Sequence, residues 1–410
     1  MVNIFSLYPA ISCCGGALLT LFIAFLVSFN RPAISYRHTL TILITQIIMA
    51  LGLLKTSFGQ ILLSQLIRLT NAISDAAQAG ISFIFGALGT SIAPWGFIFA
   101  FHVLPIIIFF SAFIAALSYL GIIEGITRLI AFFVRPLFGA SQSETACAVA
   151  KSFLGPTEAQ LLIRDALFTA STSEMFAIMV SGLSMISASL FAIYMGMGIP
   201  GSHLIAANVM GISGSLLFAK IIMPTTTQTE EPSRVGVPLQ ERPANLIEAI
   251  IKGTLDGLQL VLAIAALLVS FLALLAILNQ AFIFVGSFFG MTTVTFQDVI
   301  SYIFAPFGFL MGVSTTEAFA LSELIGIKFL ANEMVAFAEV ASKNLSDRGL
   351  ILATYALCGF SNIACLGIVV GSISTLVPER RSELSGLAWY ALLAATLSNL
   401  FSAYLVGIII

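Results

Sequence analysis

Charged residues are scarce in this sequence, and their scarcity excludes the most common class of protein. Lys, Arg, Asp and Glu together make up only 9% of the 410 residues, whereas a soluble domain carries about 25%. So few charges cannot coat the water-facing surface of a chain of this length. The formal net charge is −2 and the sequence has no basic patch, so we expect no nucleic-acid partner.

Cysteine and histidine are also rare, which argues against metal sites and against most enzyme chemistry. The sequence holds three histidines and five cysteines. All the cysteines lie in apolar segments without the spacing of metal ligands, and we expect buried free thiols at Cys13, Cys14, Cys147, Cys358 and Cys365. The sequence shows no nucleophile–base pair and no metal-ligand cluster, so we expect no enzyme activity and no resident metal or cofactor.

Long apolar runs take the place of charge. Hydrophobic residues make up 59% of the chain, and a run of about 20 such residues can cross a bilayer as a helix. We predict eight spans at residues 6–29, 38–54, 97–120, 173–198, 203–223, 257–283, 349–377 and 385–410. The first run lacks a cleavage-site pattern and is predicted to be retained. Residues 59–88 are broken by charges and glycines, and we interpret them as interfacial helices.

One clearly water-exposed stretch divides the chain into two halves. Residues 224–243 are rich in proline, threonine and charge, which indicates a linker. Arginines in the short loops mark the cytoplasmic side of a membrane protein, and here they fall on the linker's side of the eight predicted spans. We therefore expect a multi-pass protein of the cytoplasmic membrane, with a cytoplasmic linker and both termini outside.

Two further segments are apolar but too charged to be ordinary spans. Residues 144–168 carry five charges around Gly155-Pro156, and residues 305–340 also carry five charges. A charge at the middle of a span costs about 2.5–3.5 kcal/mol, and a Gly-Pro pair interrupts the hydrogen-bond ladder of a helix. We predict that both segments are re-entrant hairpins whose tips line a polar cavity.

The two predicted hairpins share a short motif. The first contains Thr157-Glu158-Ala159 and the second Thr316-Glu317-Ala318, and each hairpin precedes a span rich in small and hydroxylated residues. Corresponding broken segments in two halves of a chain are typical of repeat transporters, whose site lies near the midplane of the membrane. The chain therefore divides into an N-terminal scaffold at 1–95, a first repeat at 96–223, the linker at 224–243 and a second repeat at 244–410.

Several motifs in order along the chain now resemble one family. The stretches GFIFAFHVLP, GPTEA, NEMVAF, ALCGFSN and PERRSE, at residues 96–105, 155–159, 332–337, 356–362 and 378–383, resemble those of the concentrative nucleoside transporters. The resemblance implies an all-α membrane protein with eight transmembrane helices, interfacial helices and two re-entrant hairpins in an inverted repeat. It also implies a homotrimer, with nucleoside bound between the hairpin tips and two partly unwound spans, and uptake driven by sodium or protons.

The resemblance implies the following contacts to the base of the nucleoside. Thr157 and Glu158 match polar residues of the family's first hairpin, and Leu190 falls where the family packs an apolar side chain against the base. Pro156, however, replaces the family's glutamine, so that a side chain able to donate and accept hydrogen bonds is lost.

The resemblance implies a second group of residues for the sugar. Glu333 matches the glutamate that accepts hydrogen bonds from ribose hydroxyls, and Phe360 and Asn362 match as well, the asparagine being a ribose ligand. Cys365 replaces a serine that also touches the sugar, and a thiol donates and accepts more weakly than a hydroxyl.

The ion site of the sodium-coupled members is altered at two positions. Aligning on Gly155 places Lys151 where the family has a ligand asparagine, and aligning on Phe176 places Met185 where it has a ligand serine. An ammonium has no acceptor, and a thioether is too soft for a hard cation. Lys151 could occupy the vacated pocket, extend to the cytoplasmic interface or pair with Glu144.

The sequence therefore predicts a secondary active transporter that imports nucleosides, coupled to protons or to no ion rather than to sodium. One alternative keeps the fold but changes the solute to a nucleotide or another modified nucleoside, because the lysine would attract a phosphate. A membrane enzyme and a channel are weaker alternatives, which turnover of the solute or single-channel currents would reveal.

Overall fold

The fold consists of helices throughout the residues that the structure describes. It is a computed structural model that describes residues 8–89, 98–102, 104–155, 158–225, 243–290 and 294–410. The N-terminal half contains α2 (Pro9–Leu26), α3 (Tyr36–Lys55), α4 (Ser57–Phe85), α5 (Phe99–His102), α6 (Leu104–Tyr119), α7 (Ile122–Phe138), α8 (Gln142–Lys151), α9 (Glu158–Leu161), α10 (Arg164–Thr169), α11 (Thr172–Ser184), α12 (Phe191–Gly196) and α13 (Gly201–Ile222). The C-terminal half contains α14 (Leu246–Ser287), α15 (Phe296–Phe309), α16 (Thr315–Leu330), α17 (Glu333–Val340), α18 (Asp347–Leu357), α19 (Ile363–Leu376) and α20 (Arg381–Ile409).

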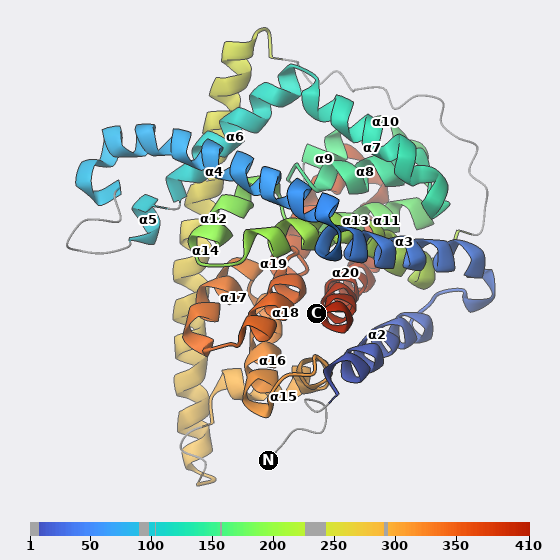
Figure 1. The fold of residues 1–410 in the computed structure, drawn as a ribbon, viewed down its shortest axis with the longest axis vertical. Coiled ribbons are helices and arrows are strands. Elements are labelled where there is room, and N and C mark those ends of the chain that lie inside the picture. The colour runs from blue at the N-terminus through green and yellow to red at the C-terminus, as the bar shows by residue number, and fades with distance from the viewer. Residues whose placement is uncertain (1–7, 90–97, 103, 156–157, 226–242, 291–293) are drawn as a thin grey trace.

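Three helices form the centre of the molecule. Of the residues in the most apolar windows of α11–α12, α13 and α20, 94%, 89% and 83% are buried. By contrast, no residue is buried in the corresponding window of α14, which runs along one side of the molecule and packs on α6 (Figure 1). The apolar residues of the three central helices therefore fill a core, whereas those of α14 face outward.

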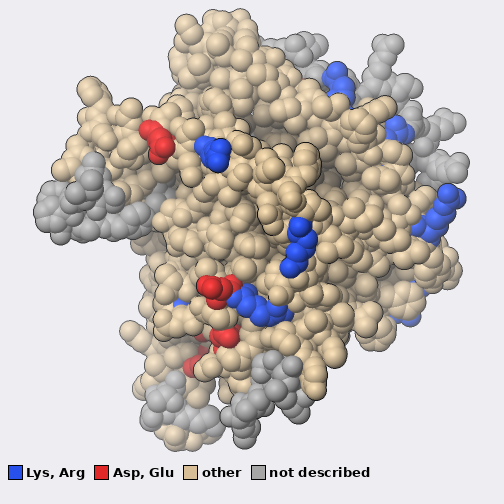
Figure 2. Space-filling model, viewed as in Figure 1, with Lys and Arg blue, Asp and Glu red and all other residues tan. Residues whose placement is uncertain are grey.

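The outer surface is apolar, as expected for a protein surrounded by lipid. Figure 2 shows only scattered charged residues on the face that it presents. Exposed aromatic side chains include Phe132 and Phe133 of α7, Phe284 of α14, and Phe288 and Phe289, which follow α14. A water-facing surface would not leave so much apolar area uncovered.

In the part of the chain that the structure describes, eight helical segments are long and apolar enough to cross a membrane, but they are not quite the eight predicted spans. The predicted span 349–377 is divided into α18 and α19, each shorter than a membrane span requires, and it is not part of this set. The segment Ser57–Gly89 enters it, because α4 forms one unbroken helix where we predicted interfacial helices.

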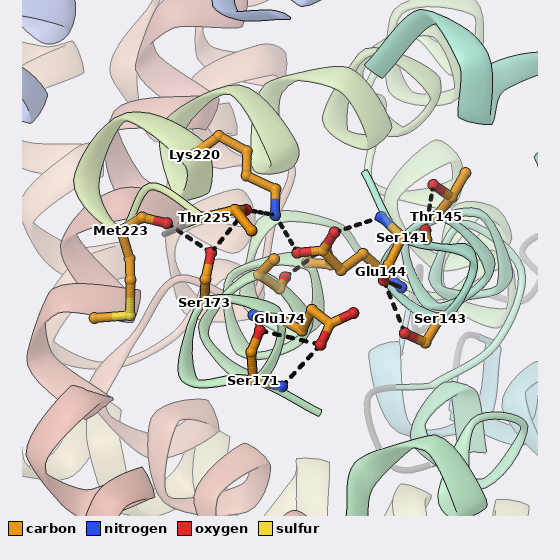
Figure 3. A network of polar contacts seen from close by, with 12 residues as sticks. Ser141, Ser143, Glu144, Thr145, Ser171, Ser173, Glu174, Lys220, Met223 and Thr225 are labelled. Carbon is orange, nitrogen blue, oxygen red and sulfur yellow. Dashed lines mark hydrogen bonds and ion pairs between the residues drawn. The ribbon is translucent and has the colours of Figure 1, made fainter. Parts of the chain in front are cut away.

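The first predicted hairpin, 144–168, corresponds to α8, α9 and α10, which we call the first hairpin. Ser141 caps α8 and Glu144 accepts a hydrogen bond from the Ser141 backbone N–H, which completes a capping box. Lys220, near the end of α13, pairs with Glu144 (Figure 3). At the other end, Arg380 donates hydrogen bonds to the carbonyl oxygens of two residues at the end of α10, Leu167 and Ala170.

The second hairpin consists of α16 and α17, which is shorter than the predicted range 305–340. Residues 305–309 belong to α15, and the hairpin turns at Ala331 and Asn332. The Thr-Glu-Ala match between the two hairpins does not join equivalent positions. Glu317 completes a capping box with Ser314 at the start of α16, as Glu144 does for α8, whereas Glu158 begins α9 beyond the turn of the first hairpin.

Candidate functional site

Two helices of the core are broken, and their breaks, which share Asn399 as a partner, frame the candidate site. The first break separates α11, which ends at Ser184, from a 3-10 turn at Ala188–Leu190 and α12. The second separates α18, which ends at Leu357, from α19. The resemblance implies two partly unwound spans without assigning them, and each of these breaks lies in a helix that follows one of the hairpins along the chain. A break exposes backbone groups that must find new partners when they are buried.

Asn208 of α13 supplies partners at the first break. Its side-chain oxygen accepts a hydrogen bond from the backbone N–H of Ile186 at 3.0 Å. Its amide nitrogen donates to the carbonyl oxygen of Ser152 at 2.8 Å, and Ser152 ends α8. One buried amide therefore connects the turn of the first hairpin to the break that follows α11.

Asn399 of α20 and Lys328 of α16 supply partners at both breaks. The Asn399 amide nitrogen donates to the carbonyl oxygens of Ser184 (2.8 Å) and Cys358 (3.1 Å). The Lys328 ammonium donates to the Asn399 side-chain oxygen at 2.7 Å and to the carbonyl oxygen of Ala356 at 2.9 Å. All three segments, the two broken helices and the second hairpin, therefore meet at one polar centre.

Glu333 and Asn362 are brought together where the second hairpin meets the second break. Glu333 is the first residue of α17 and Asn362 caps α19. One carboxylate oxygen of Glu333 accepts a hydrogen bond from the Asn362 amide at 3.0 Å, and the other accepts one from the Tyr194 hydroxyl at 3.2 Å. Both predicted sugar ligands are almost fully buried, at 4% and 0% exposed, and they share one face of the site.

Lys151 lies inside the protein beside the same site. It is the last residue of α8, its side chain is fully buried, and its ammonium lies 4.4 Å from the centroid of the Phe360 ring, a cation–π contact. Full burial excludes an extension to the cytoplasmic interface. Glu144 pairs with Lys220, and the structure gives no ion pair between Glu144 and Lys151 among the described residues.

The other predicted site residues fall into three groups. Met185 and Leu190 are buried at the first break, and a Cβ atom added at Gly211 of α13 would meet the Met185 side chain. Cys365 lies in the first turn of α19, partly exposed, and its backbone N–H donates to the Asn362 side chain at 2.7 Å. Pro156 and Thr157 lie outside the described residues, and of Glu158 only the backbone is described.

The two hairpins have similar sequences where their first arms end. Lys151-Ser-Phe-Leu-Gly in the first hairpin corresponds to Lys328-Phe-Leu-Ala in the second, and both lysines are buried near the turn. Lys328 faces the break between α18 and α19 through Ala356. Lys151 therefore ends the first arm of the first hairpin in a sequence similar to the one around Lys328 in the second hairpin.

Sequence reasoning missed four residues of this region: Tyr194, Asn208, Lys328 and Asn399. A signal was present for three of them. Asn208 and Asn399 are amides within long apolar helices, and such side chains commonly hydrogen-bond across helices. For Lys328, the Lys-Phe-Leu match between the hairpins was a usable signal.

The geometry suits binding of a neutral polar solute. A buried carboxylate accepts hydrogen bonds from hydroxyl groups, and an amide both donates and accepts. The described residues contain no group of three or more His, Cys, Asp or Glu side chains arranged to hold a metal ion. The site therefore offers side-chain hydrogen bonds and a nearby buried cation.

Three family models match the chain in sequence. They are described as the N-terminus of Na+ dependent nucleoside transporters, matching residues 15–88, "nucleoside recognition", matching residues 100–201, and the C-terminus of Na+ dependent nucleoside transporters, matching residues 203–407. Together they cover most of the chain, including both hairpins and both breaks.

Similar proteins occur in bacteria and animals. An uncharacterized transporter of Haemophilus influenzae is 37% identical, with 96% of each chain covered, and the uncharacterized transporter YutK of Bacillus subtilis is 38% identical, with 96% of this chain and 98% of the relative covered. Solute carrier family 28 member 3 of Homo sapiens is 34% identical over 96% of this chain and 59% of its own. The solved structure of CNTnw in an inward-facing substrate-bound state matches with a TM-score of 0.92 and 33% identity, covering 98% of this chain and 97% of that one.

Proposed function

The chain belongs to the Na+ dependent nucleoside transporter family, and we propose that it imports nucleosides without using a sodium gradient. It is a multi-pass protein of the cytoplasmic membrane and not an enzyme. The proposed substrate class and the proposed coupling rest on separate observations.

The contact between Glu333 and Asn362 is the observation that carries the proposal of a nucleoside substrate. In our proposal both side chains bind ribose hydroxyls, the carboxylate as acceptor and the amide as donor and acceptor. They are 3.0 Å apart and are held by different elements, the second hairpin and α19. Tyr194 adds a third polar group to the same carboxylate, and a vicinal diol could exchange hydrogen bonds with this set.

The base is bound with fewer directed contacts in this proposal. Thr157, Glu158 and Leu190 face it, whereas Pro156 offers neither donor nor acceptor side-chain atoms at the family's glutamine position. Phe360, at the second break, adds an aromatic surface beside the sugar ligands. We therefore propose that the sugar is recognised more strictly than the base.

The proposal on coupling rests on Lys151 and Met185. Lys151 is buried at the end of α8, and Met185 is buried where α11 breaks. In our proposal the ammonium supplies permanently the positive charge that sodium supplies in relatives, and Met185 removes a second ligand oxygen. The description of the matching family as Na+ dependent favours the opposite outcome. Accumulation would then require a proton, with Glu158 as its carrier, or the protein would only equilibrate its substrate.

The assembly follows the family resemblance in our proposal. Residues 1–95 would form a scaffold at the centre of a homotrimer. The repeats at 96–223 and 244–410, joined by a cytoplasmic linker at 224–243, would hold the re-entrant hairpins and the substrate. The two repeats would then act as the transport domain and move against this scaffold.

A second candidate substrate is a nucleotide or another anionic nucleoside derivative. The observation that favours it is the buried Lys151 ammonium on the Phe360 ring, because a fixed cation beside a sugar site attracts a phosphate. Uptake into proteoliposomes would separate the two candidates: labelled nucleosides and nucleotides are supplied in turn, under imposed sodium or proton gradients. Nucleoside uptake that ignores sodium supports the proposal, whereas exclusive nucleotide uptake or steep sodium dependence contradicts it.

A further inference from the structure

Lys328 places a positive charge where two helices end. The last turn of a helix carries unpaired carbonyl groups and the negative end of the helix dipole. The ammonium of Lys328 donates directly to Ala356 in the last turn of α18, at 2.9 Å. Through the side chain of Asn399 it also reaches Ser184, the last residue of α11, and Cys358, which follows α18. Lys328 is only 2% exposed, so these contacts lie inside the protein.

The partners of this ammonium are neutral oxygen atoms. They are the carbonyl of Ala356 and the side-chain oxygen of Asn399, at 2.9 and 2.7 Å. Asn399 also accepts a hydrogen bond from the hydroxyl of Ser361, at 3.0 Å. The hydrogen bonds of Glu333, five residues beyond Lys328, go to Tyr194 and Asn362 instead. A charge held by carbonyl and amide oxygens is bound much as those oxygens would bind a free cation.

We propose that Lys328 is a positioning residue, a covalently attached cation that fixes the two breaks and the second hairpin in the geometry that binds substrate. Lys328 and Glu333 flank the turn of that hairpin, and Asn362 follows the second break. A displacement of the break relative to the hairpin therefore separates Glu333 from Asn362. This inference rests on the proposed nucleoside site, and it adds a residue that touches no substrate.

Removing the charge withdraws the Lys328 donor from the Ala356 carbonyl and leaves the Asn399 oxygen with the Ser361 hydroxyl as its donor. Lys328→Met keeps most of the side-chain volume but withdraws both hydrogen bonds from Ala356 and Asn399. Loss of hydrogen bonds to a charged group of this kind corresponds to about a tenfold to hundredfold change in an equilibrium. Part of that change should appear in nucleoside affinity, because a shift of these groups in the variant would separate Glu333 from Asn362.

The experiment measures nucleoside affinity and melting temperature together, on purified full-length protein. Labelled uridine is the probe, and the variants are Lys328→Met, Lys328→Arg and Lys343→Met. Lys343 is a matched control, because it lies just after α17 of the same hairpin and pairs with Glu323 at 2.7 Å, away from both breaks. Affinity is compared only for the folded, monodisperse fraction of each variant.

We expect Lys328→Met to bind uridine about tenfold or more weakly, Lys328→Arg to recover most of that loss, and Lys343→Met to bind like the wild type. A folded Lys328→Met protein with wild-type affinity overturns the inference, whatever its melting temperature. So does an equal loss in Lys328→Arg or in Lys343→Met. If Lys328→Met does not fold, Lys328→Gln takes its place with the same expected and overturning results. Absence of uridine binding in the wild type refutes the proposed function itself.

Discussion

Replacing Glu333 by glutamine tests the sugar site while preserving its shape. In the structure, two donors converge on the two carboxylate oxygens of Glu333, the hydroxyl of Tyr194 at 3.2 Å and the amide of Asn362 at 3.0 Å. A glutamine offers one acceptor oxygen, and its amide nitrogen would face a donor. Glu333→Gln therefore removes the charge and also one acceptor, within a site that is 4% exposed at this residue.

The size of the effect follows from the hydrogen bonds that are lost. A hydrogen bond to a charged group contributes about 1.5–3 kcal/mol, which corresponds to about a tenfold to hundredfold loss of affinity. We expect this loss in calorimetry or scintillation proximity measurements with nucleoside on the purified variant. Asn362→Ala, which removes the partner amide, should weaken binding to a similar extent.

A matched control separates loss of the site from loss of the fold. Glu323→Gln alters a carboxylate of the same hairpin, one that pairs with Lys343 away from both breaks, and it should leave nucleoside affinity unchanged. Wild-type affinity in both Glu333→Gln and Asn362→Ala would refute the assignment of these residues to the sugar.

Three further predictions concern specificity, coupling and stability. In competition assays, the affinities of uridine, cytidine and adenosine should lie within about one order of magnitude of each other, because a proline replaces the hairpin glutamine and its hydrogen bonds. Analogues that lack the 2′ and 3′ hydroxyls should compete worse than all three. Sharp selectivity for the base without a need for these hydroxyls would contradict this prediction. Replacing sodium by choline at fixed pH should leave uptake unchanged, whereas the double variant Lys151→Asn, Met185→Ser should gain sodium stimulation. Steep sodium dependence of the wild type would show that the assignment of Lys151 to the ion position is wrong. Gly359→Ala should lower the melting temperature, because its Cβ would lie 2.7 Å from the Ser184 carbonyl oxygen and overpacking costs about 1–3 kcal/mol; Gly367→Ala, which meets nothing within 4 Å, is the control.

The position of the first hairpin was predictable because its sequence contains strong local signals. Charges and the Gly155-Pro156 pair marked residues 144–168, and the structure places α8 to α10 there. The first break was not predictable in the same way, since Met185, Ile186 and Ser187 include no helix-breaking residue. Its backbone groups are stabilised by amides from α13 and α20, and such partners are visible only once the helices are packed.

The pairing of the two repeats shows why a short sequence match can mislead. Thr-Glu-Ala occurs in both hairpins, but Glu317 is part of a capping box at the start of α16. Ser or Thr followed three residues later by Glu is a general signal for the start of a helix, and it recurs at Ser141 and Ser171. The proximity of Glu333 and Asn362, in contrast, followed from the resemblance rather than from any local pattern, since 29 positions separate them.

The fastening of the first hairpin at both ends determines how it can open. At the start of α8, Glu144 is held by Lys220 of α13 (Figure 3), and at the end of α10 two carbonyl groups are held by Arg380, which precedes α20. A flap hinged at its base would have to break these buried contacts on every cycle. An excursion of the whole hairpin that keeps these contacts must therefore carry α13 and the start of α20 along with it.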